Sequence, residues 1–356
     1  MFTNSYRTVL YLSIVSGLFQ IAICKESSSA TITFGGDLML GGYYNSPDYG
    51  TMTRLTDKVD SLYLLGGAAL VKNELFRNLR PVIEKADYCV ANLEGPVTEN
   101  IPMGSIESKM YPKLIPLRQS QFTPDVLKAV GIDLVSLANN HMFDYNNEEG
   151  LTETIKRLEN KVEYVGAGIG NNAFNPIVKE LNGIRFSIFG VSDIIHPGEM
   201  CAKPGKLGIA GIADTSDYEN SEWIRLLTDK IAEVRSESDF VIVLIHYGPS
   251  SGSKLNERQI SITDILLRDG ADLIVGSHSH HKQEIKEIRN DRNQISQLVF
   301  YGLGNFVFGG KQGAQALSAL AIVNFLKNRD EKQMTYRTVE FYPNPDTTFT
   351  PVLVNP

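Results

Sequence analysis

The stretch Leu134–Asp144 reads Leu-Val-Ser-Leu-Ala-Asn-Asn-His-Met-Phe-Asp and joins a strand pattern to a polar ending. Its apolar, β-prone beginning predicts a buried strand. The polar ending supplies the amide of Asn140, the imidazole of His141 and the carboxylate of Asp144. Taken alone, it is also the pattern of an ordinary turn with a hydrogen-bonded histidine. Loops at the carboxyl ends of strands carry the chemistry of open α/β sheets, so we predict an α/β fold with its site here.

The composition indicates a single large globular domain. The 356 residues are 42% hydrophobic and 21% charged, which provides enough apolar material for a large core. The formal net charge is −7, so the basic surface typical of nucleic-acid-binding proteins is not expected. We therefore expect no nucleic-acid partner.

Residues 1–30 form a candidate targeting segment. Arg7 precedes an uncharged, mainly apolar run at Val9–Ile23, and a short polar stretch follows it. The run is short for a membrane-spanning helix and has the length of a signal-peptide core. We therefore expect an exported protein of the cell envelope, membrane-anchored or secreted. Cleavage of a signal peptide after Ala30, a retained N-terminal anchor and lipidation at Cys24 all remain open.

The rest of the chain alternates strand and helix patterns. It is expected to form one domain at residues 31–345, followed by a C-terminal tail at 346–356. Phe240–Ile245 is almost continuously apolar, as expected for a strand that is buried on both faces of a sheet. The dipeptide Asn182-Gly183 lies between two β-prone runs and predicts a tight hairpin.

Acidic side chains stand at two further strand ends. The β-prone run Thr31–Phe34 is expected to stop at a glycine turn, with Asp37 directly after it. Glu94 stands where a second apolar strand ends, just before a Gly-Pro pair. Each carboxylate alone is also explained as an exposed turn residue.

Histidines follow the same pattern, because four of the six in the chain lie directly after apolar strands or in the loops they feed. The carboxyl ends of neighbouring strands converge at one sheet edge, so these side chains are expected to meet there. The expected metal ligands are Asp37, Glu94, Asn140, His246, His278 and His280. Mixed nitrogen and oxygen ligands suit Mn²⁺, Fe²⁺ or Zn²⁺ better than Ca²⁺. Alternation in an extended loop would direct His278 and His280 to two different ions.

A two-metal centre of this kind points to phosphoester hydrolysis. Two ions about 3.5–4 Å apart polarise a phosphoryl oxygen and generate hydroxide at neutral pH. His141, which is not needed as a ligand, is positioned in the sequence to protonate the leaving oxygen, with Asp144 holding its ring. His141 and Asp144 are therefore the candidate catalytic residues.

Seven ordered motifs resemble a known family. They are Gly-Gly-Asp-Leu-Met-Leu, Ala-Asn-Leu-Glu-Gly-Pro, Ser-Leu-Ala-Asn-Asn-His-Met-Phe-Asp, Val-Gly-Ala-Gly, Ile-His-Tyr-Gly, Gly-Ala-Asp-Leu-Ile-Val-Gly-Ser-His-Ser-His and Tyr-Gly-Leu-Gly-Asn-Phe-Val-Phe. The set resembles the bacterial capsule-synthesis CapA family, which is associated with poly-γ-glutamate synthesis and belongs to the calcineurin-like metallophosphoesterases. The resemblance runs from about Thr31 to Phe308, nearly the whole chain after the targeting segment.

The resemblance implies a four-layer α/β/β/α sandwich with metals at the strand ends. In this family Asp37 looks like a metal ligand, and Glu94 stands where a bridging Asp usually lies. By this resemblance, His280 would be a ligand of the first metal. The ligands of the second metal would be Asn140, His246 and His278.

The same resemblance assigns the neighbouring residues. His141 corresponds to the catalytic acid, and Asn139 and Asn305 are expected around the metal ligands. The usual Asp-x-His of phosphoesterases is Asp37-Leu38-Met39 here, so the first metal lacks one imidazole. The acidic residue that commonly follows the His-x-Gly of the family is absent at Pro249-Ser250.

These observations lead to one principal hypothesis and two alternatives. The principal one is an exported, metal-dependent, phosphoesterase-like hydrolase that acts on an anionic polymer or phosphoester in poly-γ-glutamate or related envelope-polymer synthesis and export. Membrane-bound capsule synthase subunits are expected partners. One alternative is a non-catalytic scaffold that holds the polymer within a membrane synthase complex. The other is a secreted metal-dependent nucleotidase or phosphodiesterase.

Overall fold

The structure is a computed structural model that describes residues 27–43, 55–99, 117–144, 148–195, 198–212, 221–309, 315–328, 331–344 and 348–354. The apolar run of the expected targeting segment lies outside the described residues. No helix within the described ranges is both long enough and apolar enough to cross a bilayer.

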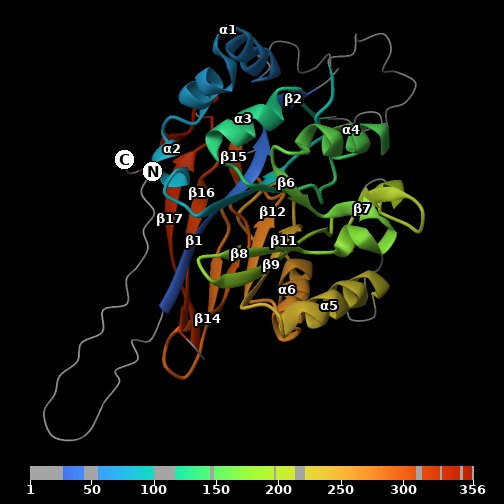
Figure 1. Cartoon of the computed structure of the whole chain (residues 1–356), viewed down its shortest axis with the longest axis vertical. Coiled ribbons are helices and arrows are strands. Elements are labelled where there is room, and N and C mark those ends of the chain that lie inside the picture. The colour runs from blue at the N-terminus through green and yellow to red at the C-terminus, as the bar shows by residue number, and fades with distance from the viewer. Residues whose placement is uncertain are drawn as a thin grey trace, which may run out of the picture.

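One long sheet of fourteen strands forms the centre of the protein (Figure 1). Its hydrogen-bonded order is β6-β5-β3-β1-β16-β17-β14-β12-β11-β9-β8, with β15, β18 and β13 added to β1, β17 and β14. Within the described residues, the link between β17 and β14 is a single residue pair, Met334 with Ile295. The sheet therefore consists of two half-sheets that meet along this seam.

The first half-sheet contains β6 (Glu163–Val165), β5 (Leu134–Ser136), β3 (Tyr88–Leu93), β1 (Ser27–Met39), β15 (Asn305–Phe308), β16 (Ser318–Asn328), β17 (Glu331–Tyr342) and β18 (Val352–Leu353). The second contains β14 (Ile295–Phe300), β13 (Ile285–Arg289), β12 (Leu273–Ser277), β11 (Phe240–His246), β9 (Ile184–Ser192) and β8 (Ile177–Leu181). Two small ribbons pair β2 (Gly41–Tyr43) with β4 (Leu117–Gln119) and β7 (Ala167–Ile169) with β10 (Leu207–Ile209).

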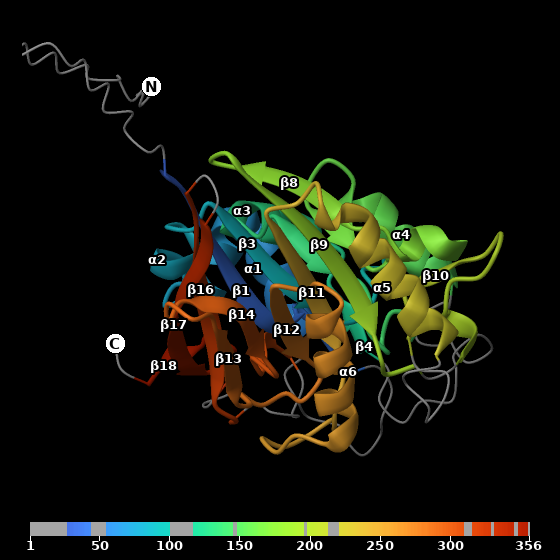
Figure 2. The same ribbon diagram turned by 90° about the horizontal axis from the view of Figure 1, so that it is seen from below.

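The helices cover the outer faces of the two half-sheets (Figure 2). They are α1 (Leu55–Leu75), α2 (Arg80–Ile83), α3 (Thr123–Val130), α4 (Glu148–Leu158), α5 (Glu222–Arg235) and α6 (Glu257–Arg268), with short 3₁₀ turns η3 (Gly170–Phe174) and η4 (Gly198–Met200). The two longer helices of the second half begin at side-chain caps. Ser221 accepts a hydrogen bond from Ile224 N before α5, and Asn256 accepts one from Gln259 N before α6.

Three apolar clusters define the layers. One packs α1 to α4 against β1, β3 and β5, and another packs α5 and α6 against β9, β11 and β12. The third lies between the half-sheets and contains Phe34 and Val90 from one side with Phe186 and Ile242 from the other. The order is therefore helices, sheet, sheet, helices, and the expected four-layer sandwich is confirmed.

Strand β11 shows why this architecture produces continuous apolar runs. Ile242 and Leu244 belong to the cluster between the half-sheets, whereas Val241 and Val243 belong to the cluster under α5 and α6. Successive side chains of a strand point to opposite faces, and here both faces are covered. The hairpin at Asn182-Gly183 is also confirmed, because β8 and β9 pair antiparallel around it.

The glycines of β1 have a different role from the expected turn. The strand does not stop there but continues to Met39, with an irregular register between Phe34 and Asp37. A Cβ atom on Gly36 would lie 1.8 Å from Gly304 O, so the position tolerates no side chain. The close approach lets Asp37 N donate to Gly304 O at 2.9 Å. The glycines thus fix the backbone position of Asp37.

The ends of the domain reach beyond the expected boundaries. Strand β1 begins at Ser27 and pairs with β16 from that residue onward, and Ala30 is only 1% exposed. Cleavage after Ala30 would therefore remove four paired residues of β1. At the other end, β18 in the expected tail pairs with β17.

Candidate metal centre

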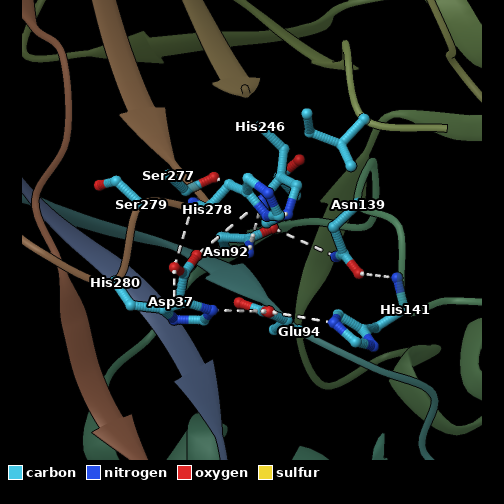
Figure 3. Close-up of polar contacts among 12 residues, drawn as sticks. Asp37, Asn92, Glu94, Asn139, His141, His246, Ser277, His278, Ser279 and His280 are labelled. Atoms are coloured by element: carbon cyan, nitrogen blue, oxygen red, sulfur yellow. Dashed lines mark hydrogen bonds and ion pairs between the residues drawn. The ribbon is translucent and has the colours of Figure 1, made fainter. Parts of the chain in front are cut away.

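The side chains of the candidate site come from the carboxyl ends of strands in both half-sheets. Strands β1, β3 and β5 run parallel in the first half, and β11 and β12 run parallel in the second. The chain segments that leave these strand ends face one another, and their polar side chains point into one space (Figure 3). The predicted convergence of strand ends is therefore present in the structure.

The first ligand group consists of Asp37, Glu94 and His280. Their candidate ligand atoms lie within 4.8 Å of one another, and all three residues are buried. His280 Nδ1 lies 3.5 Å from Asp37 Oδ2, and His280 Nε2 lies 3.8 Å from Glu94 Oε1. Two ligands that each bind one metal at about 2.0–2.2 Å stand roughly 3–4 Å apart. The separation of His280 Nε2 from Glu94 Oε1 fits this value, and Nε2 is the candidate ligand atom because Nδ1 contacts Asn305.

Two features prepare His280 to act as a ligand. Its Nδ1 donates to Asn305 Oδ1 at 2.8 Å, which leaves Nε2 free of a proton and directed toward Glu94. Burial lowers the pKa of His280, and the nearby Asp37 carboxylate opposes this shift only in part. The ring is therefore held neutral, as a metal ligand must be.

The second ligand group consists of Asn140, His246 and His278. His246 Nε2 lies 2.8 Å from Asn140 Oδ1 and 3.0 Å from His278 Nδ1. The other ring nitrogen of His246, Nδ1, contacts Ser277 Oγ at 2.8 Å. This contact turns Nε2 toward the other two ligand atoms. An amide oxygen and two imidazoles thus form a compact second group beside the first.

The loop that carries both His278 and His280 is not extended, so the expected reason for their separation is wrong. Both residues have left-handed backbones, with φ of 86° and 53°. Their ring centroids lie 6.2 Å apart, and each ring belongs to a different ligand group. Left-handed non-glycine residues cost about 1–3 kcal/mol each and concentrate at functional sites. The loop therefore stores strain where the imidazoles are needed.

His141 and Asp144 form a pair at the edge of the first group. His141 Nδ1 forms a short hydrogen bond with Asp144 Oδ2, and Leu117 N donates to the same oxygen at 2.8 Å. His141 Nε2 lies 3.7 Å from Glu94 Oε1, so the ring faces the ligands (Figure 3). The His141 side chain is 14% exposed and that of Glu94 is 0% exposed. His141 therefore stands between the buried ligands and solvent.

The remaining predicted residues also lie at the site. Asn139 is fully buried, and its side chain donates to Leu93 O at 2.8 Å and accepts from His141 N at 3.2 Å. Met39, at the position where a second imidazole was noted as missing, packs with Leu117 and Phe308. The first group therefore has one imidazole and two carboxylates.

Two residues of the site were missed from the sequence. Asn92 donates to Asp37 Oδ1 at 2.8 Å, and Ser277 holds the ring of His246. The signal for Asn92 was present, because it is a polar residue within the buried apolar strand Tyr88–Leu93. Buried polar side chains usually have a specific partner.

The donor chemistry of the two groups fits divalent ions. The first supplies two carboxylates and a neutral imidazole, and the second supplies two imidazoles and an amide oxygen. Such ligand sets suit Mn²⁺, Fe²⁺ or Zn²⁺, whereas Ca²⁺ prefers six to eight oxygen ligands. Each group combines ligands from both half-sheets, so an ion in either place would bind both halves of the protein.

Comparison with known families identifies the class of protein. The model of the family described as "Bacterial capsule synthesis protein PGA_cap" matches residues 31–310, which is most of the chain. The chain belongs to this family. The resemblance to capsule-synthesis proteins that the motifs indicated is thus confirmed.

Two relatives from Bacillus show how far the similarity extends. Capsule biosynthesis protein CapA of Bacillus anthracis is 28% identical over 292 residues, which cover 80% of this chain and 61% of that protein. PGA biosynthesis protein CapA of Bacillus subtilis is 27% identical over 299 residues, or 83% of this chain and 68% of that protein. This chain thus spans about three fifths of the length of the first relative.

Among solved structures, the Haemophilus influenzae NAD nucleotidase (NadN) superposes with a TM-score of 0.46 and 12% sequence identity. The superposition covers 93% of this chain and 61% of the nucleotidase chain.

Proposed function

We propose that this PGA_cap protein is an exported, metal-dependent hydrolase of the phosphoesterase type that acts in the synthesis or export of an anionic envelope polymer such as poly-γ-glutamate. Family membership supports the polymer context, and the two ligand groups support the metal dependence. The observation that carries the hydrolase assignment is the His141–Asp144 pair, which faces the ligand Glu94 and is partly open to solvent.

The six candidate ligands would hold the ions in a water-poor environment. Asp37 and Glu94 are 0% exposed, and His246 and His280 are 1% and 3% exposed. Bound divalent ions would supply charge that polarises a phosphoryl oxygen and makes a nucleophile available at neutral pH. The protein contributes the fixed geometry and the exclusion of bulk water, which strengthens electrostatic interactions at the centre.

His141 would supply the proton for the leaving oxygen. Asp144 holds Nδ1 of the ring, so Nε2 is the nitrogen that faces the site. His141 and Asn140 are the two partly exposed members of the site, so substrate is expected to approach from their side.

Membrane synthase subunits remain the partners that we propose from the polymer context of the relatives. Export is proposed from the apolar N-terminal run. The first described strand begins at Ser27, so a cleavage site upstream of that residue is compatible with the complete β1.

The test combines metal analysis with hydrolysis of bis(p-nitrophenyl) phosphate by the full chain. The wild type is expected to bind Mn²⁺ stoichiometrically and to turn over the diester, and His141→Ala is expected to lose activity about 10²–10⁴-fold. His281→Ala is the matched control, because His281 lies in the same loop as two ligands but accepts a hydrogen bond from Gly252 N. A 5′-nucleotide substrate added in parallel tests the nucleotidase alternative.

Each outcome decides between the hypotheses. Turnover that depends on metal and on His141 supports the hydrolase. Stoichiometric metal without turnover of either substrate favours the scaffold. Protein that binds no divalent ion contradicts the proposed centre.

A further inference from the structure

Asn92 lies at the point where the two ligand groups meet. It is 5% exposed and stands beside Asp37 in the register of β1 and β3. Its side-chain nitrogen donates to Asp37 Oδ1 at 2.8 Å and lies 3.4 Å from His246 Nδ1 (Figure 3). The amide thus contacts one ligand from each group without contributing a negative charge.

Backbone contacts fix which way this amide points. An asparagine amide can be turned by 180° without changing its shape, so its orientation must follow from its partners. The Asn139 side chain has no such freedom, because His141 N only donates to its oxygen and Leu93 O only accepts from its nitrogen. The same Asn139 nitrogen donates to Asn92 Oδ1 at 3.2 Å. The nitrogen of Asn92 must therefore face Asp37.

The orientation of Asp37 follows in turn. Its Oδ1 accepts from Asn92, and its Oδ2 accepts from His278 N at 3.1 Å. Two donors on opposite oxygens set the plane of the carboxylate. Oδ2 then lies 3.5 Å from the ring of His280, within the first ligand group.

We propose that Asn92, whose orientation is fixed by Asn139, is a positioning residue that orients Asp37 for metal binding. Because its side chain is a neutral amide, it does so without adding a third negative charge to the buried centre. This inference rests on the proposed metal centre. Groups that orient metal ligands typically change metal affinity by 10–100-fold when they are removed. The neutral charge of the amide matters as well, because a carboxylate here would repel Asp37 in the metal-free protein.

Two substitutions at this position are expected to act in opposite directions on metal binding. Asn92→Ala removes the donor that orients Asp37, so the Mn²⁺ affinity should fall by about tenfold or more. Asn92→Asp keeps the shape but adds a negative charge beside Asp37. It should lower the melting temperature of the metal-free protein and increase the rise in melting temperature on Mn²⁺ addition above the wild-type rise.

The experiment measures thermal unfolding in EDTA and across a Mn²⁺ titration, together with the Mn²⁺ dissociation constant by calorimetry, on the full chain. Asn344→Asp is the matched control, because Asn344 is a buried asparagine that accepts from Phe349 N after β17. It makes the same chemical change away from the ligands, so the response to Mn²⁺ should equal that of the wild type. Asn139→Ala removes the hydrogen bond that fixes the orientation of the Asn92 amide but keeps Asn92 itself. It should therefore weaken Mn²⁺ binding less than Asn92→Ala.

The outcomes separate this inference from the proposed function. If the wild type binds Mn²⁺ but both Asn92 variants keep its affinity and its Mn²⁺-dependent rise, Asn92 is a structural residue and the inference is overturned. If the wild type binds no Mn²⁺, the proposed centre fails and the inference fails with it. Should Asn92→Ala not fold, Asn139→Ala still decides, since a Mn²⁺ affinity equal to that of the wild type contradicts the inference.

Discussion

The two ligand groups of the centre differ in charge although they share one buried space. The first contains two carboxylates, from Asp37 and Glu94, with a single imidazole. The second contains only neutral ligands, an amide oxygen and two imidazoles. A buried pair of carboxylates attracts a cation strongly in a low-dielectric environment, whereas neutral ligands depend on coordination alone. The comparison teaches that the first position should fill before the second.

The largest effect is expected when the charge of the first group is reduced. Glu94→Gln removes one negative charge at nearly constant volume, and changes at the residues around a metal typically cost about 10–100-fold in metal affinity. The affinity for the first ion should therefore fall on the order of tenfold to a hundredfold. Calorimetric titration with Mn²⁺ checks this.

The same variant makes a second, independent test of the charge argument. Without metal, Glu94→Gln should unfold at a higher temperature than the wild type, because a buried charge is costly. Glu340→Gln is the matched control, since Glu340 pairs with Lys282 at 2.6 Å nearer the surface and lies outside the ligand groups. Equal Mn²⁺ affinity in Glu94→Gln and wild type would contradict the unequal roles of the groups.

A smaller change should follow from removing a ligand of the neutral group. His246→Ala is expected to weaken binding of the second ion by about tenfold, enough for that ion to be lost on dialysis, while the first still binds with near wild-type affinity. Metal analysis after dialysis should then show about one ion per chain, compared with the two that we propose for the wild type. Loss of both ions in this variant would show that the two positions fill together.

Each ligand group also contains an imidazole that is oriented by one neighbouring side chain, and these two neighbours can be compared. Asn305 orients His280 in the first group, and Ser277 orients His246 in the second. Replacing either by Ala should weaken its own ion by about tenfold and leave the other position nearly unchanged. Titrations of the two variants side by side measure this, and equal losses at both positions in either variant would count against separate groups.

The smallest predicted effect is a pH dependence of the metal-free protein. Burial lowers the pKa of His280, so below the ordinary histidine pKa of about 6.5 the unfolded chain binds a proton that the folded chain does not. The free energy of unfolding is therefore unaffected by His280 well above a pH of about 6.5. It decreases as the pH falls from about 6.5 toward the lowered pKa of His280 in the folded protein. Melting temperatures in EDTA from pH 8 to 5 should decline less for His280→Gln than for the wild type. An unchanged decline would rule His280 out as its source.

The sequence supported the positions of the ligands better than their geometry. Polar residues at the ends of apolar runs are visible in a sequence, and parallel strands bring such ends together, so the candidate ligands could be chosen without coordinates and do lie together in the structure. The four layers were expected only through the resemblance to a family, because periodicity does not say how two half-sheets face each other.

Three details needed tertiary structure. The left-handed backbones of His278 and His280 are set by the surrounding loop, not by local preference. The continuation of β1 through Gly36 depends on the close backbone of Gly304, which is far away in the sequence. The role of Asn92 depends on the register of two strands and on an amide in a third segment.

The seam between the half-sheets gives the ions a further consequence. Both ligand groups draw side chains from the two sides of that seam, where β14 and β17 share one described residue pair. Bound ions would then act as crosslinks that make unfolding of the whole domain cooperative. Calorimetry with Mn²⁺ should show a single transition, and chelation should broaden it or separate it into two. A single sharp transition under both conditions would mean that the cluster between the sheets is sufficient for cooperativity.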